Sequence, residues 1–158
     1  MSLAIERLTG LGFSTSAQEW PSKPVRLIVP FAPGGGTDIV ARVLAQKLTE
    51  SFKQTVIVDN RAGGGGTLGV ETAVRASPDG YTTIIMSGSY ATNAAMFKMS
   101  FDPVNDILPM GLIGDTAFVL VLQPAVPLKS VAELVAHAKA KPGGLNYASS
   151  GTGGIAHL

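Results

Sequence analysis

Two glycine-rich turns hold the residues whose types and spacing most plainly suggest chemistry. The first turn runs from Pro33 to Asp38, and the second runs from Ser149 to Gly154. Glycine lets a backbone approach a ligand closely, and the first N–H groups of a following helix lack internal partners and carry partial positive charge. Such turns bind anions, so we predict that the pair holds one carboxylate through backbone N–H groups and neighbouring hydroxyls.

The same glycines have a plainer interpretation, in which they only make tight turns in an α/β sheet. Asp38 also has two interpretations. A carboxylate in the first turn of a helix stabilises the helix but repels an anionic ligand, so we predict that Asp38 caps the helix or orients the loop rather than contacting the ligand.

A third glycine loop carries Gly64, Gly66 and Gly69 in the dinucleotide pattern G-x-G-x-x-G. The pattern begins several residues after the preceding predicted strand, where a true fingerprint begins immediately, and no ribose-binding acid follows at the right point. No loop ends in the G-K-[ST] of a phosphate-binding P-loop. A nucleotide-binding or enzymatic α/β domain using the same loops therefore stays as the alternative function.

Catalytic and metal-binding residues are scarce. The chain has no cysteine, and its two histidines, His137 and His157, show neither the spacing of a metal site nor a neighbouring nucleophile and acid. The segment Ser149-Ser150-Gly151 lacks the pattern of a nucleophile elbow. We therefore expect no catalytic residue, no metal and no cofactor.

The amino-acid composition limits the kinds of partner that the protein can bind. Hydrophobic residues make up 46% of the 158 residues and charged residues 15%, against a usual charged share of about 25%. This high share of hydrophobic residues excludes a disordered chain. The net charge of +1 provides no basic surface that would attract nucleic acid or an anionic membrane. No apolar run reaches the roughly 18 residues of a membrane span. The expected partner is a small molecule, with no membrane insertion.

Short β-rich runs alternate with helical patterns, which is typical of βαβ units and a parallel sheet, so the predicted fold class is α/β. Strands are predicted at 25–29, 55–58, 82–86, 110–113, 118–122 and 145–148, and helices at 37–52, 67–76 and 130–140. The inward face of the first helix is predicted to hold Val40, Val43, Leu44 and Leu48. That of the last helix is predicted to hold Val131, Leu134, Val135 and Ala138. Ser130 and Glu133 fit a capping box at its start.

Three parts are predicted along the chain. Residues 1–19 resemble a leader or the remnant of a signal peptide, 20–103 form a first lobe, and 104–158 form an incomplete second lobe. A further helix predicted to start at Ile155 has nothing to follow it, so we expect the fold to be truncated. Uncovered strand edges invite pairing, which leaves self-association of an inactive fragment as another possibility.

Several motifs together resemble the Bug family, the substrate-binding receptors of tripartite tricarboxylate transporters in Gram-negative bacteria. They are Trp20-Pro-Ser-Lys-Pro-Val-Arg26, Val29-Pro-Phe-Ala-Pro-Gly-Gly-Gly-Thr-Asp38, Asp59-Asn-Arg-Ala-Gly-Gly64, Ser77-Pro-Asp-Gly-Tyr81, Phe101-Asp-Pro103, Ala138-Lys-Ala-Lys-Pro-Gly143, and Tyr147-Ala-Ser-Ser-Gly-Thr-Gly153 with His157-Leu158. The resemblance covers nearly everything from Trp20 onward, and in this order the motifs are highly specific.

The resemblance implies a periplasmic binding protein of the type II class, with two lobes that close on a di- or tricarboxylate, an amino acid or a related acid. It further implies that the two turns clasp a carboxylate and that Ser87 reaches the distal end of the ligand. The residues implied for the first lobe are Phe31, Ala32, Gly34, Gly35, Gly36, Thr37 and Asp38, and those implied for the second are Ser149, Ser150, Gly151 and Thr152. The implied partners are the membrane components of the transporter.

The chain departs from the family's pattern in three places. Phe52-Lys-Gln54 stands where the family usually has glycine before glutamine, and the loop from Arg61 to Gly66 replaces one that contains proline. Both changes are expected to be tolerable at a surface. Members also run to about twice this length, so the second lobe is expected to be unfinished.

Overall fold

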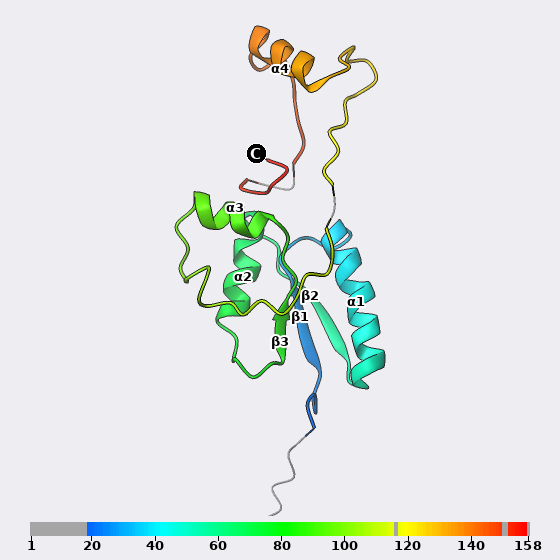
Figure 1. Cartoon of the computed structure of the whole chain (residues 1–158), viewed down its shortest axis with the longest axis vertical. Helices are drawn as coiled ribbons and strands as arrows, with labels where there is room; N and C mark the ends of the chain where they lie inside the picture. Colours follow the sequence, from blue (N-terminus) through cyan, green and yellow to red (C-terminus); the bar gives the residue numbers. More distant parts are fainter. Residues whose placement is uncertain (1–18, 116, 150–151, 158) are drawn as a thin grey trace, which may run out of the picture.

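Three parallel strands form the sheet of the protein, whose computed structural model describes residues 19–115, 117–149 and 152–157 (Figure 1). The strands are β1 (Val25–Val29), β2 (Val56–Asn60) and β3 (Thr82–Ile84), in the order β2-β1-β3. β1 lies in the centre and pairs Val25 with Val56 and Arg26 with Thr82. The predicted α/β class with a parallel sheet is confirmed. The predicted leader, residues 1–19, lies almost entirely outside the described residues.

Helices cover both faces of the sheet. α1 (Gly36–Phe52) packs on β1 and β2, and α2 (Thr67–Val74), preceded by the 3-10 turn η1 (Gly64–Gly66), packs on β1 and β3. The connections between parallel strands are right-handed. The chain passes from β1 to β2 on one side and then crosses back over β1 to β3 on the other side. These opposite directions place α1 and α2 on opposite faces of the sheet. Figure 1 shows them on opposite sides of the sheet. α3 (Ser89–Met96) follows β3 and contacts η1.

The core lies between the sheet and α1. It consists of Val25, Leu27, Val29, Ala41, Ala45, Val56 and Ile85, with Leu44, Leu48 and Phe52 partly buried against it. The prediction that Val40 and Val43 face inward is wrong, since both are exposed, at 43% and 59%. The helix instead turns its small residues, Ala41 and Ala45, onto the strands. Their short side chains let the helix backbone approach the sheet closely.

The amino ends of the strands are closed by aromatic packing. The Trp20 ring lies 5.3 Å from the Phe52 ring and 6.0 Å from the Tyr81 ring. Lys23 Nζ lies 3.2 Å from Asp79 Oδ2 and 4.3 Å from the centre of the Tyr81 ring. The motif that begins at Trp20 and the motif that ends at Tyr81, both of which carry the family resemblance, therefore contact one another here.

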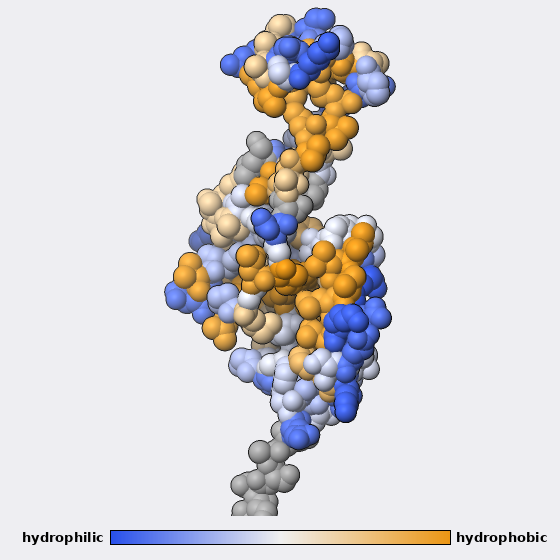
Figure 2. All heavy atoms as spheres, turned by 45° about the vertical axis from the view of Figure 1, so that its right-hand side comes forward, coloured by the Kyte–Doolittle hydropathy of each residue, from blue (hydrophilic) through white to orange (hydrophobic). Residues whose placement is uncertain are grey.

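The part of the chain from 104 to 157 contributes one helix, α4 (Val131–Ala140), and no strand within its described residues. The strands predicted at 110–113, 118–122 and 145–148 are wrong, as is the helix predicted to start at Ile155, where the chain makes turns. A strand needs a hydrogen-bonded neighbour, and no described segment lies paired with these runs. Figure 2 shows apolar side chains gathered along the segments that lead to and from α4.

α4 itself has the predicted bounds and cap. Ser130 Oγ accepts a hydrogen bond from Glu133 N, which is the first half of a capping box. The Glu133 carboxylate accepts its bond from Lys129 N, one residue before the N-cap, instead of from Ser130 N. The predicted inward face is wrong, because no residue of α4 is buried and Val131 is 64% exposed. The helix has formed from local signals without a surface to pack on.

Candidate ligand-binding site

Three loops meet at the carboxyl edge of the sheet, because parallel strands all end at the same edge. Residues 30–35 follow β1, residues 61–66 follow β2, and residues 85–88 follow β3. In the strand order β2-β1-β3, the chain leaves β1 toward one side for β2 and reaches β3 on the other. In open α/β sheets, ligands bind at the carboxyl ends of strands where the order reverses in this way.

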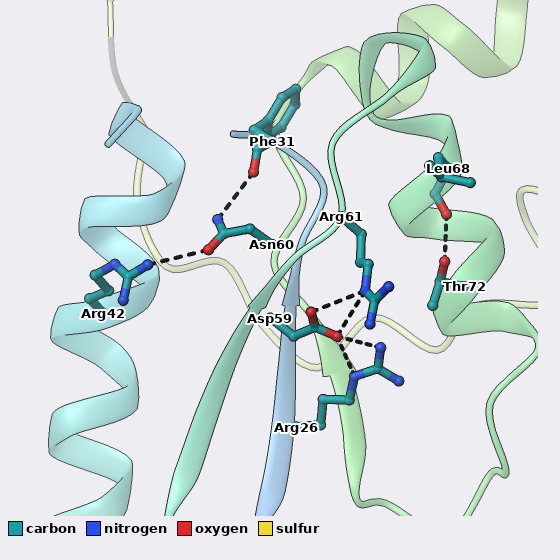
Figure 3. A network of polar contacts seen from close by, with 8 residues as sticks. All are labelled: Arg26, Phe31, Arg42, Asp59, Asn60, Arg61, Leu68 and Thr72. Carbon is teal, nitrogen blue, oxygen red and sulfur yellow. Dashed lines mark hydrogen bonds and ion pairs between the residues drawn. The ribbon is translucent and has the colours of Figure 1, made fainter. Parts of the chain in front are cut away.

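The first loop is held by a buried carboxylate. Asp38 is 2% exposed, and its Oδ2 accepts hydrogen bonds from Gly34 N (2.8 Å) and Arg42 Nε (2.9 Å). Asn60 Nδ2 donates to Asp38 Oδ1 (2.9 Å) and to the carbonyl oxygen of Phe31 (3.1 Å). Figure 3 shows Asn60 between Phe31 and Arg42, whose Nη2 donates to Asn60 Oδ1. The loop is therefore fixed from β2 and from the second turn of α1.

These contacts keep Asp38 ionised. The Arg42 hydrogen bond, with those from Gly34 N and Asn60, holds the pKa of Asp38 well below its usual range. The same pairing raises the pKa of Arg42. Because both oxygens of Asp38 accept hydrogen bonds within the protein, its carboxylate orients the loop, as one of the two interpretations predicted.

The N-terminus of α1 is open beside this loop. The N-cap residue is Gly35, so no side chain caps the helix. The first hydrogen bond within the helix runs from Ile39 N to Gly35 O. The N–H groups of the first turn therefore have no helical partner. A Cβ added at Gly36 would meet nothing within 4 Å, so there is free space beside the first residue of the helix.

Asp59 ties β1 to the loop after β2. Arg26 donates to Asp59 Oδ2, and Arg61 Nε donates to Asp59 Oδ1 at 3.0 Å (Figure 3). Burial acts to raise the pKa of Asp59, but the hydrogen bonds from the two arginines prevail and lower it. The network fixes the direction in which the chain leaves β2.

A hollow opens between these loops. Phe31 and Ser87, both predicted site residues, line it together with Pro30, Gly65, Gly66, Thr67, Val70, Met86, Tyr90, Asn93, Met99 and Phe101. The Tyr90 hydroxyl donates to Pro103 O, and burial raises its pKa. The structure thus brings the loop after β1 and the loop after β3 to one place.

Sequence reasoning missed the loop after β2 as part of this hollow. The sequence pointed to Gly66 through the dinucleotide pattern and to Gly65 not at all, and changes in that loop were expected to be tolerable at a surface, yet Gly66 is buried. A Cβ at Gly66 would lie 3.4 Å from the Phe31 ring, and one at Gly69 would lie 2.6 Å from Pro30 Cβ. These glycines permit close packing against the first loop. The position of the loop after a parallel strand was the signal that could have revealed it.

The second turn is described only in part, because Ser150 and Gly151 lie outside the described residues. Ser149 and Thr152 are exposed. A Cβ added at Gly65 would lie 2.5 Å from the carbonyl oxygen of Thr152. Thr152 therefore abuts the loop after β2, which in turn packs on Phe31, just before the first turn.

The histidines and carboxylates form no metal centre in the described part of the chain, where no group of three potential ligands comes together. His157 lies 6.2 Å from the Tyr147 ring, and His137 is on α4. Within residues 19–115, 117–149 and 152–157, none of the helices combines the length and the hydropathy that a membrane span requires.

This fold is that of the periplasmic binding proteins, whose solved structures it matches. One is a protein of R. palustris with adipate, 36% identical, with a TM-score of 0.77 over 86% of this chain and 46% of that one. Another is MatC from Rhodopseudomonas palustris with bound malate, 31% identical, with a TM-score of 0.71 over 77% of this chain and 42% of that one.

The sequence itself defines the family. Residues 40–158 match the tripartite tricarboxylate transporter family receptor, and the protein belongs to this family, which includes the Bug proteins. Protein BugT of Bordetella pertussis (strain Tohama I) is 40% identical over 152 residues, which are 94% of this chain and 47% of BugT. The chain spans about half the length of the curated relatives it matches.

Proposed function

We propose that this protein captures a small organic carboxylate in the periplasm and delivers it to the membrane components of a tripartite tricarboxylate transporter, without catalysing a reaction. The observation that carries the proposal is the uncapped N-terminus of α1, which lies at the carboxyl edge of the sheet beside a loop held by Asp38. A preorganised cluster of N–H groups with a helix dipole behind it is suited to a carboxylate.

In this proposal each predicted residue has a role. Asp38 shapes the first loop, and Ser87 extends from the loop after β3 toward the distal end of the ligand. The backbone of the first turn binds one carboxylate through Phe31, Ala32, Gly34, Gly35, Gly36 and Thr37. The second turn closes over it with Ser149, Ser150, Gly151 and Thr152.

The proposed ligand class is a dicarboxylate or related small acid. Support comes from the relatives solved with adipate and with malate, each of which carries two carboxylates. The local N–H groups and hydroxyls need no basic side chain, which suits a chain of net charge +1.

Calorimetric titration of the protein with adipate and malate tests this function, with NAD and ATP as the rival class. Gly36→Asp places a negative charge at the first position of α1, where a Cβ has free space. We expect it to weaken adipate binding at least tenfold by repelling the carboxylate, while the uncharged Gly36→Asn weakens binding much less.

Gly111→Asp is the matched control, because a Cβ at Gly111 also meets nothing within 4 Å and the residue belongs to neither glycine turn nor to any helix. It should leave adipate affinity unchanged. Binding of NAD or ATP with no response to either dicarboxylate would overturn the receptor function in favour of a nucleotide-binding domain.

A further inference from the structure

One face of α3 is polar and buried. Ser89, Thr92 and Asn93 occupy positions i, i+3 and i+4, so their side chains share a face of the helix. Ser89 is 3% and Asn93 2% exposed, although both are polar. Buried polar groups are retained where they make hydrogen bonds, so this face has a specific partner.

The partner is the backbone of the segment from Thr152 to Ile155. Thr92 Oγ1 donates to the carbonyl oxygen of Gly153 at 2.7 Å, and Ile155 N donates to Ser89 Oγ at 3.1 Å. These bonds join residues more than sixty positions apart in the sequence. The helix therefore holds the end of the second glycine turn by its peptide groups.

Close approach at this contact depends on glycine. Gly153 has φ +79°, and a Cβ there would lie 2.0 Å from Asn93 Oδ1. Asn93 Nδ2 donates to Gly65 O at 2.8 Å, so its amide lies between the second turn and the loop after β2. Among the described residues Asn93 Oδ1 has no hydrogen-bond partner, and Asn93 also lines the hollow.

We propose that Ser89, Thr92 and Asn93 are positioning residues that hold the segment from Thr152 to Ile155, at the end of the second glycine turn, against α3, and so set the affinity for the carboxylate. This inference rests on the proposed function, in which both turns bind one ligand. None of the three residues needs to touch the ligand to act in this way.

The first test compares Thr92→Val with Thr92→Ser, using calorimetric titration with adipate. Valine keeps the shape of threonine but removes the hydroxyl that binds Gly153 O, whereas serine retains it. We expect at least a tenfold loss of adipate affinity in Thr92→Val and a change of less than twofold in Thr92→Ser. Equal affinities in the two variants would overturn the positioning role.

The second test compares two glycines with left-handed backbone. Gly143 has φ +75° with nothing within 4 Å of an added Cβ, so Gly143→Ala carries the backbone strain of Gly153→Ala without its collision with Asn93. We expect Gly153→Ala to weaken adipate binding at least tenfold more than Gly143→Ala. Similar losses in both would mean that the contact with α3 does not matter for binding.

Amide exchange measured by NMR separates this inference from the function on which it rests. Ser89→Ala should speed exchange of the Ile155 amide at least tenfold, and the Ile39 amide, bonded within α1, is the control. Unchanged Ile155 exchange in a protein that binds adipate would overturn the inference and leave the function standing. A wild-type protein that binds no carboxylate would overturn the function, while the exchange rates would still decide whether α3 holds the turn.

Discussion

Two regions of the chain, 19–103 and 104–157, have comparably apolar runs but bury them very differently. In the first, Ile28 and Val29 of the central strand are fully buried. In the second, Leu112 is 89% and Val119 is 80% exposed. The difference is one of partners. β1 has a strand on each side and a helix on each face, whereas no described strand pairs with the runs of the second region. An apolar run becomes a strand only when another strand pairs with it.

Removing a core side chain should break the first region and leave the second unaffected. We expect Ile28→Ala to lower the free energy of unfolding by about 3 kcal/mol, from lost burial and the cavity left behind. Ile113→Ala removes the same atoms from a side chain that is 55% exposed, and should cost less than about 0.5 kcal/mol. Urea unfolding measures both. Equal costs would mean that residue 113 is buried in solution.

The exposed runs of the second region predict association between copies of the chain. Unpaired extended segments invite pairing, so light scattering should show a mass above that of a monomer. The double variant Val119→Lys with Val121→Lys should reduce this mass. Val43→Lys, which charges an exposed position on the helix α1, should not. A monomeric wild-type protein would remove the prediction.

The two regions also differ in how much the side-chain amide of an asparagine is expected to stabilise them. Asn60→Ala leaves Asp38 Oδ1 and Phe31 O without their shared donor, so we expect a loss of about 2 kcal/mol in the free energy of unfolding. Asn105 Nδ2 also bonds an aspartate, Asp102, but at an exposed turn. Asn105→Ala should therefore cost less than about 0.5 kcal/mol. Similar urea midpoints for the two variants would contradict a structural role for Asn60.

Acid should weaken the first loop through Asp38. Its pKa is lowered in the folded protein, chiefly by Arg42, so the unfolded chain binds its proton more readily. The stability it contributes is complete above the unfolded value of about 4 and is lost as the pH falls below it. The difference in stability between the wild type and Asp38→Asn should shrink between pH 6 and pH 3. A constant difference in urea unfolding would show that the charge of Asp38 contributes nothing.

How much of the fold could be predicted from the sequence depends on whether local residues or distant partners determine each element. Local signals sufficed for α1, α4 and the three paired strands, and for the turn at Gly34, whose φ is +87°. They failed wherever a distant partner decides the outcome. The rotation of α1 onto Ala41 depends on the sheet, and the runs at 110–113 and 118–122 depend on a neighbour.

The site was predictable to the same extent. Phe31 and Ser87 could be placed near one another because both follow strands of one parallel sheet. The role of Asn93 could not, because no local pattern connects it with Gly65 or Gly153. Such contacts come from tertiary packing, which the local patterns of a single sequence do not reveal.

A departure from the family's pattern supplies the smallest expected effect. Lys53 stands where the family usually has glycine, and it is the C-cap of α1 with φ 53° and ψ 25°, a left-handed conformation that costs a residue with a Cβ about 1 kcal/mol. Lys53→Gly should therefore raise the free energy of unfolding by about 0.5 kcal/mol, after the greater freedom of glycine in the unfolded chain is subtracted. Lys53→Ala retains the Cβ and should give no such gain, which controls for the lost charge. A urea midpoint for Lys53→Gly at or below that of Lys53→Ala would mean that α1 does not end in this left-handed turn in solution.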